Sequence, residues 1–116
     1  MSHLRWPVCF ALASLVVGCA RPMRDIEPNF VDANRFAGAS CSQLVAERAR
    51  RARALIFSGL QQDQISQDDR TRTLGAPTPM GTLFEDDVEP EIARLKGELR
   101  AIDTMHAIMN CGSDYR

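Results

Sequence analysis

The stretch that decides the fold covers residues 88–109, VEPEIARLKGELRAIDTMHAIM. Its seam positions recur at steps of four and three, which is the period of an amphipathic helix. These positions are Val88, Ile92, Leu95, Leu99, Ile102, His106 and Met109. Asp86 or Asp87 can cap such a helix, and Gly112 lies just beyond its expected end. We therefore predict a helix over residues 87–110.

An earlier helix is predicted over residues 40–70. Ser40 and Gln43 have the spacing of a capping box, in which two side chains satisfy backbone N–H groups at a helix start. A second narrow seam follows, formed by Val45, Ala49, Ala52, Ile56 and Gly59. If the helices fold back antiparallel, facing residues have numbers that add to a constant, which pairs Val45 with His106 and Gly59 with Ile92. The two seams therefore predict one hairpin, with a connector over residues 71–86 that contains glycine and proline.

The expected fold is all-α, an antiparallel two-helix hairpin of the coiled-coil kind over residues 40–112. Two helices bury little apolar surface for the number of residues that they order. Self-association into a four-helix bundle, or docking on a larger envelope protein, would supply the missing burial. Four apolar residues off the strict seam are candidates for this second surface: Leu55, Phe57, Met105 and Ile108.

Residues 1–18 have the organisation of an export signal. His3 and Arg5 precede an apolar run over residues 8–17, and no acidic residue occurs before Asp25. The run is much shorter than the roughly 20 residues that a membrane-spanning helix needs. We therefore expect a signal peptide that is removed from the mature protein.

The end of this signal, Val16-Val17-Gly18-Cys19, resembles the bacterial lipobox. The resemblance implies that Cys19 receives a diacylglyceryl group, becomes the N-terminus and is then N-acylated. Several acyl chains give stable anchoring, so membrane lipid is the expected partner. Ala20, where an aspartate would favour the inner membrane, implies an outer-membrane lipoprotein that faces the periplasm. The alternative is an ordinary secretory signal with a cysteine near its end.

Two further thiols, Cys41 and Cys111, remain after the leader and the lipidation site are set aside. In an oxidising periplasm they favour one disulfide, and their positions fit the hairpin register to within a residue. On the loop-entropy model such a bridge contributes roughly 4 kcal/mol. Position 111 would face away from the seam on a regular helix, so the chain must fray or turn near Asn110. A metal site that combines both thiols with His106 is the alternative, although it lacks the usual close ligand pairs.

Residues 19–39 contain Pro22 and Pro28 and show no sustained period. One interpretation is a lipidated, flexible tether. The other is a segment that docks on the helices through its apolar residues, which are Ile26, Phe30, Val31 and Phe36. Residues 113–116 are expected to be a short tail.

The composition disfavours several classes of function. Lys and Arg number 14 against 15 Asp and Glu, so no net field would attract nucleic acid. The densest charge cluster lies within residues 48–53 and contains four arginines, which spread around the helix. We expect a solvated surface partly paired with Glu47, with contact to anionic lipid or cell-wall polymer as the alternative. The sequence contains no nucleophile–histidine motif or phosphate loop, so we assign no catalytic residue, metal or cofactor and expect His106 to be partly buried.

The segment Glu91 to Leu99, EIARLKGEL, lies between Cys41 and Cys111. In this arrangement the chain resembles small lipoproteins widespread in Alphaproteobacteria, which share a lipobox, a helix opened by cysteine and a second helix of the EIxxLKGE type closed by cysteine. The resemblance implies shape and location but no activity. We therefore expect a non-enzymatic envelope lipoprotein that acts as a structural or protein-interaction module. The alternative is an accessory factor that handles cell wall, lipid or metal through Arg48–Arg53 or His106.

Overall fold

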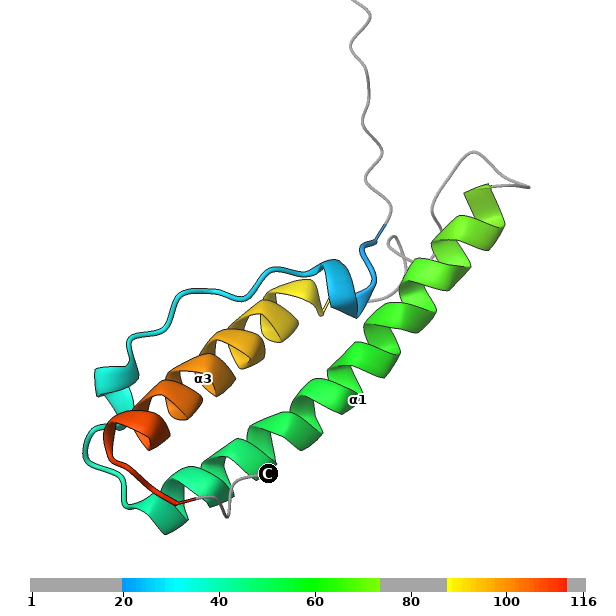
Figure 1. Ribbon diagram of the computed structural model, residues 1–116. Helices are drawn as coiled ribbons and strands as arrows, with labels where there is room; N and C mark the ends of the chain where they lie inside the picture. Colours follow the sequence, from blue (N-terminus) through cyan, green and yellow to red (C-terminus); the bar gives the residue numbers. More distant parts are fainter. Residues whose placement is uncertain (1–19, 74–87, 113–116) are drawn as a thin grey trace, which may run out of the picture.

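The computed structural model describes residues 20–73 and 88–112, and all regular structure in these two ranges is helical. Helix α1 spans Cys41–Thr73 and helix α3 spans Glu89–Ile108. Two short 3-10 turns precede them, η1 (Met23–Asp25) and η2 (Ala33–Phe36). The two helices run side by side in opposite directions (Figure 1). The predicted all-α helical hairpin is therefore confirmed.

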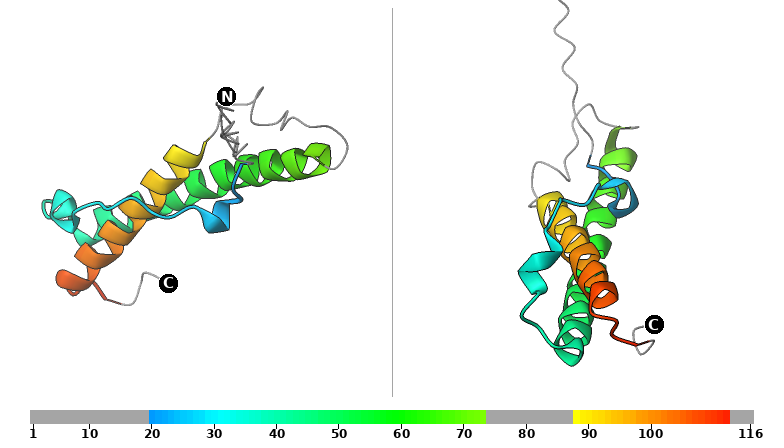
Figure 2. Two further views of the ribbon diagram at one scale, coloured as in Figure 1. Left: turned by 90° about the horizontal axis from the view of Figure 1, so that it is seen from above. Right: turned by 60° about the vertical axis from the view of Figure 1, so that its left-hand side comes forward.

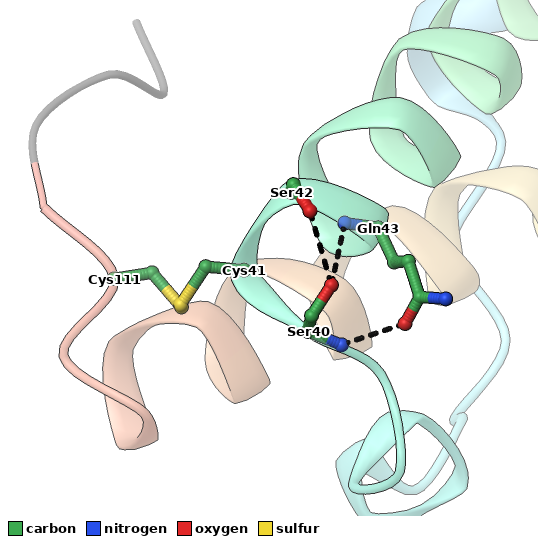
Figure 3. Close-up of a disulfide and its surroundings, with 5 residues drawn as sticks. All are labelled: Ser40, Cys41, Ser42, Gln43 and Cys111. Carbon is green, nitrogen blue, oxygen red and sulfur yellow. Dashed lines mark hydrogen bonds between the residues drawn. A yellow bond between two sulfur atoms is a disulfide. The ribbon is translucent and has the colours of Figure 1, made fainter.

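The start of α1 has the predicted capping box. Ser40 Oγ accepts a hydrogen bond from the backbone N–H of Gln43 at 3.2 Å, and Gln43 Oε1 accepts one from the backbone N–H of Ser40 at 2.8 Å (Figure 3). The helix runs on to Thr73, past the end expected at residue 70. The leader with Cys19, the rest of the connector with its capping aspartates, and the tail at 113–116 lie outside the described residues.

The end of α3 is a Schellman turn built on Asn110. This residue has a φ of 52°, in the left-handed region that asparagine tolerates better than most non-glycine residues. The N–H of Cys111 donates to the carbonyl of His106, and the N–H of Asn110 donates to the carbonyl of Ala107, both at 3.2 Å. The helix thus ends at Ile108 instead of residue 110. The predicted turn near Asn110 is confirmed, and it directs Cys111 toward α1.

The face of α1 that packs on α3 differs from the predicted one. Leu44 is fully buried, whereas Val45 is 36% exposed and Ile56 is 61% exposed. The inward positions are Leu44, Arg48, Arg51 and Leu55. The predicted α1 seam is therefore wrong by one residue, which corresponds to a rotation of roughly 100°. The cause is that two inward positions hold arginines, whose charges are received by carboxylates of α3.

The predicted seam of α3 is closer to the structure. Ile92, Leu95 and Ile102 are buried as expected. Met105, which we assigned to an exposed second surface, is buried, and Leu55 is half-buried, so these two assignments are wrong. Met105 is buried because α3 lies between α1 on one side and residues 20–39 on the other (Figures 1 and 2). Leu55 is half-buried because it lies on the inward face of α1, against the cluster of Ile92 and Ala93.

Residues 20–39, which we call the strap, pack along α3 and the second half of α1 (Figure 2). Ile26 is only 2% exposed. The N–H of Asn29 donates to the carbonyl of Ala93 at 2.9 Å, and Lys96 Nζ donates to the carbonyls of Met23 and Ile26 at 2.6 and 2.7 Å. The tether interpretation is therefore wrong for residues 20–39. The docking alternative is confirmed for Ile26, Val31 and Phe36, but it is wrong for Phe30, which is 94% exposed.

Two small apolar clusters form the core, and the strap contributes to both. The cluster near the disulfide contains Leu44, Ile102, Met105 and Cys111, with Ala33, Phe36, Ala39 and Cys41 packed against it. The other contains Ile26, Ile92 and Ala93, with Met23, Leu55 and Val88 packed against it. Both clusters combine residues from α1, α3 and the strap, so the hairpin core is complete only when the strap is docked.

Candidate functional site

The disulfide closes the open end of the hairpin. Cys41, the first residue of α1, is bonded to Cys111 directly after the Schellman turn, with their Cα atoms 5.5 Å apart (Figure 3). This bond confirms the predicted pairing. Because both sulfur atoms are in the bond, neither is a thiolate that could bind a metal together with His106. Within residues 20–73 and 88–112, no group of three or more His, Cys, Asp or Glu side chains is placed to hold a metal ion.

A buried ion network joins α1, α3 and the strap. Its centre is Glu98 of α3, which is 4% exposed. Its carboxylate lies 2.5 Å from Arg51 Nε, 2.8 Å from Arg94 Nη1 and 3.9 Å from Arg35 Nη1. The guanidinium of Arg51 also lies over the ring of Phe36, 5.4 Å from its centroid, which adds a cation–π contact to the strap.

The charges of this network are arranged to keep Glu98 ionised. Burial alone would raise the pKa of Glu98, but hydrogen bonds from Arg51 and Arg94 outweigh it, so the pKa lies below its ordinary value of 4.5. A hydrogen bond from Arg51 likewise lowers the pKa of Glu47. A carboxylate that is ionised and fully engaged at neutral pH is a poor general acid or base. The network is therefore suited to holding three segments together.

The arginine cluster of α1 is divided between two faces. Arg48 and Arg51 point inward, and Arg48 Nε lies 2.9 Å from Asp103 Oδ1 on α3. Arg50 and Arg53 are exposed on the outward side, where Arg50 Nη2 lies 2.6 Å from Glu47 Oε2. Since Arg51 also bonds Glu47, the expected partial pairing with Glu47 is confirmed. The inward pair was not foreseen, because the sequence does not reveal which arginines face α3.

The outward side of α1 carries exposed apolar side chains, which we call the outer stripe. It consists of Val45, Ile56, Phe57 and Leu60. The last three are each more than 60% exposed and lie within little more than one helical turn. An exposed apolar group of this kind on a helix, bordered by Arg50 and Arg53, is typical of an interaction surface. Phe57 and Ile108 are exposed as predicted for a second surface.

The second half of α1 holds the start of the strap through three polar side chains, which we call the N-terminal clamp: Gln62, Asp63 and Asp69. Asp69 Oδ2 accepts a hydrogen bond from the N–H of Ala20 at 3.1 Å, and Asp63 Oδ1 accepts one from the N–H of Met23 at 2.7 Å. Gln62 Nε2 donates to the carbonyl of Arg21 at 2.9 Å. The sequence analysis missed the clamp, because polar residues on a helix are expected to face solvent.

The clamp is reinforced by Gly59, which lies directly against Met23. A Cβ at position 59 would stand 2.1 Å from Met23 Sδ, so any larger residue would require the Met23 side chain to move. A glycine within a long helix disfavours that helix unless close packing requires it. Two signals in the sequence indicate the clamp: the glycine at position 59 and the polar residues that follow it at helical spacing.

In the part of the chain that the structure describes, no helix combines the length and the apolar character needed to cross a membrane. Comparison with known proteins found no matching family model, no matching curated protein and no matching solved structure. The inferences about function that follow therefore come from the residues and their geometry.

Proposed function

We propose that the chain is a membrane-anchored lipoprotein of the bacterial cell envelope, acylated on Cys19. Its hairpin acts as a structural or protein-interaction module without catalytic activity. The proposed location is the outer membrane, with the hairpin facing the periplasm. The observation that carries the proposed interaction role is the outer stripe, an exposed apolar surface on a helix whose opposite face is already covered.

Two features support this role. The hairpin has a disulfide at its open end, which suits a small domain exposed to an oxidising compartment. The carboxylates and guanidinium groups that line a hollow at the centre of the fold, Arg51, Arg94 and Glu98, are bonded to one another. An interaction surface is therefore better supported than an active site, and the outer stripe is its strongest candidate.

The anchor is tested with Cys19→Ser in the native host. The wild-type protein should sediment with outer membranes, and the variant should not be acylated. Mass spectrometry of the N-terminal peptide gives the direct readout, because acyl groups on Cys19 add a defined mass. A wild-type N-terminus without acyl groups would contradict the proposal.

The interaction surface is tested with a photo-crosslinking amino acid at Phe57 in intact cells. Ser42 is the control position, because it is exposed on α1 but lies outside the outer stripe. We expect one reproducible adduct from position 57 and none from position 42. The adduct mass distinguishes a second copy of this chain from another envelope protein. A monomer without an adduct from position 57 would count against an interaction module.

A further inference from the structure

We propose that the outward side of the strap, marked by Phe30, is the surface that contacts the lipid bilayer. This inference rests on the proposed acylation of Cys19 and names the face that the anchor brings to the membrane. The occupant of this face is the lipid of the same bilayer that holds the acyl chains. The outer stripe of α1 then remains available to a protein partner.

No spacer separates the proposed anchor from the folded protein. Ala20 follows Cys19 directly, and its backbone N lies 3.1 Å from Asp69 Oδ2. Ala20, the first described residue, is therefore one peptide bond from the proposed attachment point, because the Cα atoms of consecutive residues are about 3.8 Å apart. A lipoprotein with a long linker can turn any face toward the membrane, but this attachment brings the strap side of the molecule to the bilayer.

Phe30 is held outward by its neighbours in the strap. The N–H of Asn29 donates to the carbonyl of Ala93, and the side chain of Val31 lies against Gly97. Because both neighbours are fixed on α3, the side chain of Phe30 projects away from the helix and is 94% exposed. A rigidly presented phenyl ring can enter the boundary between head groups and acyl chains, where peripheral segments bury Phe, Trp and Leu side chains.

The surface next to Phe30 has room for lipid. Phe30 borders an open hollow of about 440 Å³ between the strap and α3, and its walls include Pro28, Val31 and Ala101. Lipid that covered Phe30 would also cover these apolar walls. The contact would thus bury more apolar surface than the ring alone provides.

The outer stripe, which is the competing apolar surface, lies on a different side of α1 from the N-terminal clamp. Leu60 precedes Asp69 by nine residues, which places the two side chains about 180° apart around α1. Phe57 is separated from Asp69 by about 120° in the same way. When the clamp side faces the bilayer, the outer stripe is therefore turned away from it.

The charges of the strap indicate that the contact is apolar and not electrostatic. Three arginines of the strap, Arg21, Arg24 and Arg35, are matched in number by Asp25, Glu27 and Asp32. A mixed surface of this kind is not drawn selectively to anionic lipid. Contact with the bilayer should therefore be equal on zwitterionic and anionic membranes.

The test uses tryptophan fluorescence. Trp6 is the only tryptophan and lies in the leader, so the mature protein has none. Phe30→Trp and the matched control Phe57→Trp are each purified as the full-length mature chain, tested for acylation by mass spectrometry and reconstituted into phosphatidylcholine vesicles. Circular dichroism and the mass of the non-reduced protein verify the helices and the disulfide. We expect brominated lipid to remove more than half of the emission of Phe30→Trp and little of the emission of Phe57→Trp.

The outcomes of this experiment distinguish failure of the proposed function from failure of the proposed membrane contact. If mass spectrometry of the same samples finds no acyl group on Cys19, the proposed function fails and this inference fails with it. If Cys19 is acylated but the indole of Phe30→Trp stays in water, only the inference is overturned. Equal quenching of both variants overturns the assignment of one face to the membrane. A requirement for phosphatidylglycerol in the vesicles overturns the apolar basis of the contact.

Discussion

Gly97 of α3 lies so close to Asn29 of the strap that a Cβ at position 97 would stand 2.1 Å from the Asn29 carbonyl oxygen. In an exposed helix interior, Gly→Ala stabilises by about 1 kcal/mol. Here we predict the opposite sign, a loss of about 1–3 kcal/mol for Gly97→Ala, because the strap must move away from α3. Urea unfolding measures the difference. Gly38→Ala is the control, since no atom lies within 4 Å of a Cβ there, and an equal effect at both positions would contradict the close packing.

Leu44 and Val45 test which face of α1 is buried. Leu44 is fully buried and Val45 is 36% exposed, although the two residues are adjacent. Leu44→Ala should lower the free energy of unfolding by about 2–5 kcal/mol, because it leaves a cavity in the cluster with Ile102 and Met105. Val45→Ala should change it by about 0.5 kcal/mol or less. If thermal or urea unfolding showed a larger loss of unfolding free energy for Val45→Ala than for Leu44→Ala, the α1 seam predicted from the sequence would be supported instead.

The disulfide should contribute a large share of the stability of so small a fold. Cys41 and Cys111 are separated by 70 residues, and removal of a bridge closing a loop of this size costs roughly 4 kcal/mol. We predict that the Cys41→Ala/Cys111→Ala double variant unfolds at a much lower urea concentration than the oxidised protein. Reduction of the wild-type protein should give the same midpoint as the double variant. An unchanged midpoint after complete reduction would show that the bridge does not stabilise the fold.

The pH dependence of stability should depend on Glu98. Its folded-state pKa lies below the ordinary value of 4.5, so its contribution is present at neutral pH and is lost as the pH falls through the folded pKa. We predict that Glu98→Gln lowers stability at pH 7 and flattens the acid limb of the free energy of unfolding plotted against pH. Glu27→Gln, on the exposed part of the strap, is the control. Parallel acid limbs for wild type and Glu98→Gln would contradict this role.

The N-terminal clamp should be visible in amide hydrogen exchange. Asp63 accepts from the N–H of Met23, so Asp63→Ala should accelerate exchange in residues 20–23. The amide of Asn29, which donates to Ala93, should keep its protection because that contact is separate. Asp68→Ala is the neighbouring control outside the clamp. If exchange in residues 20–23 is as fast in the wild type as in Asp63→Ala, the clamp does not hold the strap.

The hairpin itself could be predicted because its signals are local or periodic. The capping box at Ser40, the seam positions Ile92, Leu95 and Ile102 and the spacing of the two cysteines each follow from general rules. The Schellman turn at Asn110 was required by the bond at Cys111, and the structure contains it. These features belong to single elements or to one register, so a sequence pattern is sufficient to find them.

The rotation of α1 and the docking of the strap depend on contacts that no period reveals. α1 has apolar residues on two faces, one that contains Leu44 and one that contains Val45. The Leu44 face packs on α3, because Asp103 and Glu98 of α3 bind the arginines of that face. The strap is held largely by backbone groups, so its side chains show no regular pattern. The outer stripe shares Val45 and Ile56 with the seam that was predicted to face α3, which explains why part of it resembles a helix interface.

The docking of the strap sets an order of assembly. A chain is synthesised from its N-terminus, so residues 20–39 exist long before Ala93 and Lys96, whose groups hold them. The contacts of the strap with Ala93 and Lys96 can therefore form only after α3 has been synthesised, whereas the N-terminal clamp on α1 is available earlier. A truncation before Ala93 would therefore leave not only a shorter hairpin but also a strap that keeps the clamp on α1 and loses its partners on α3.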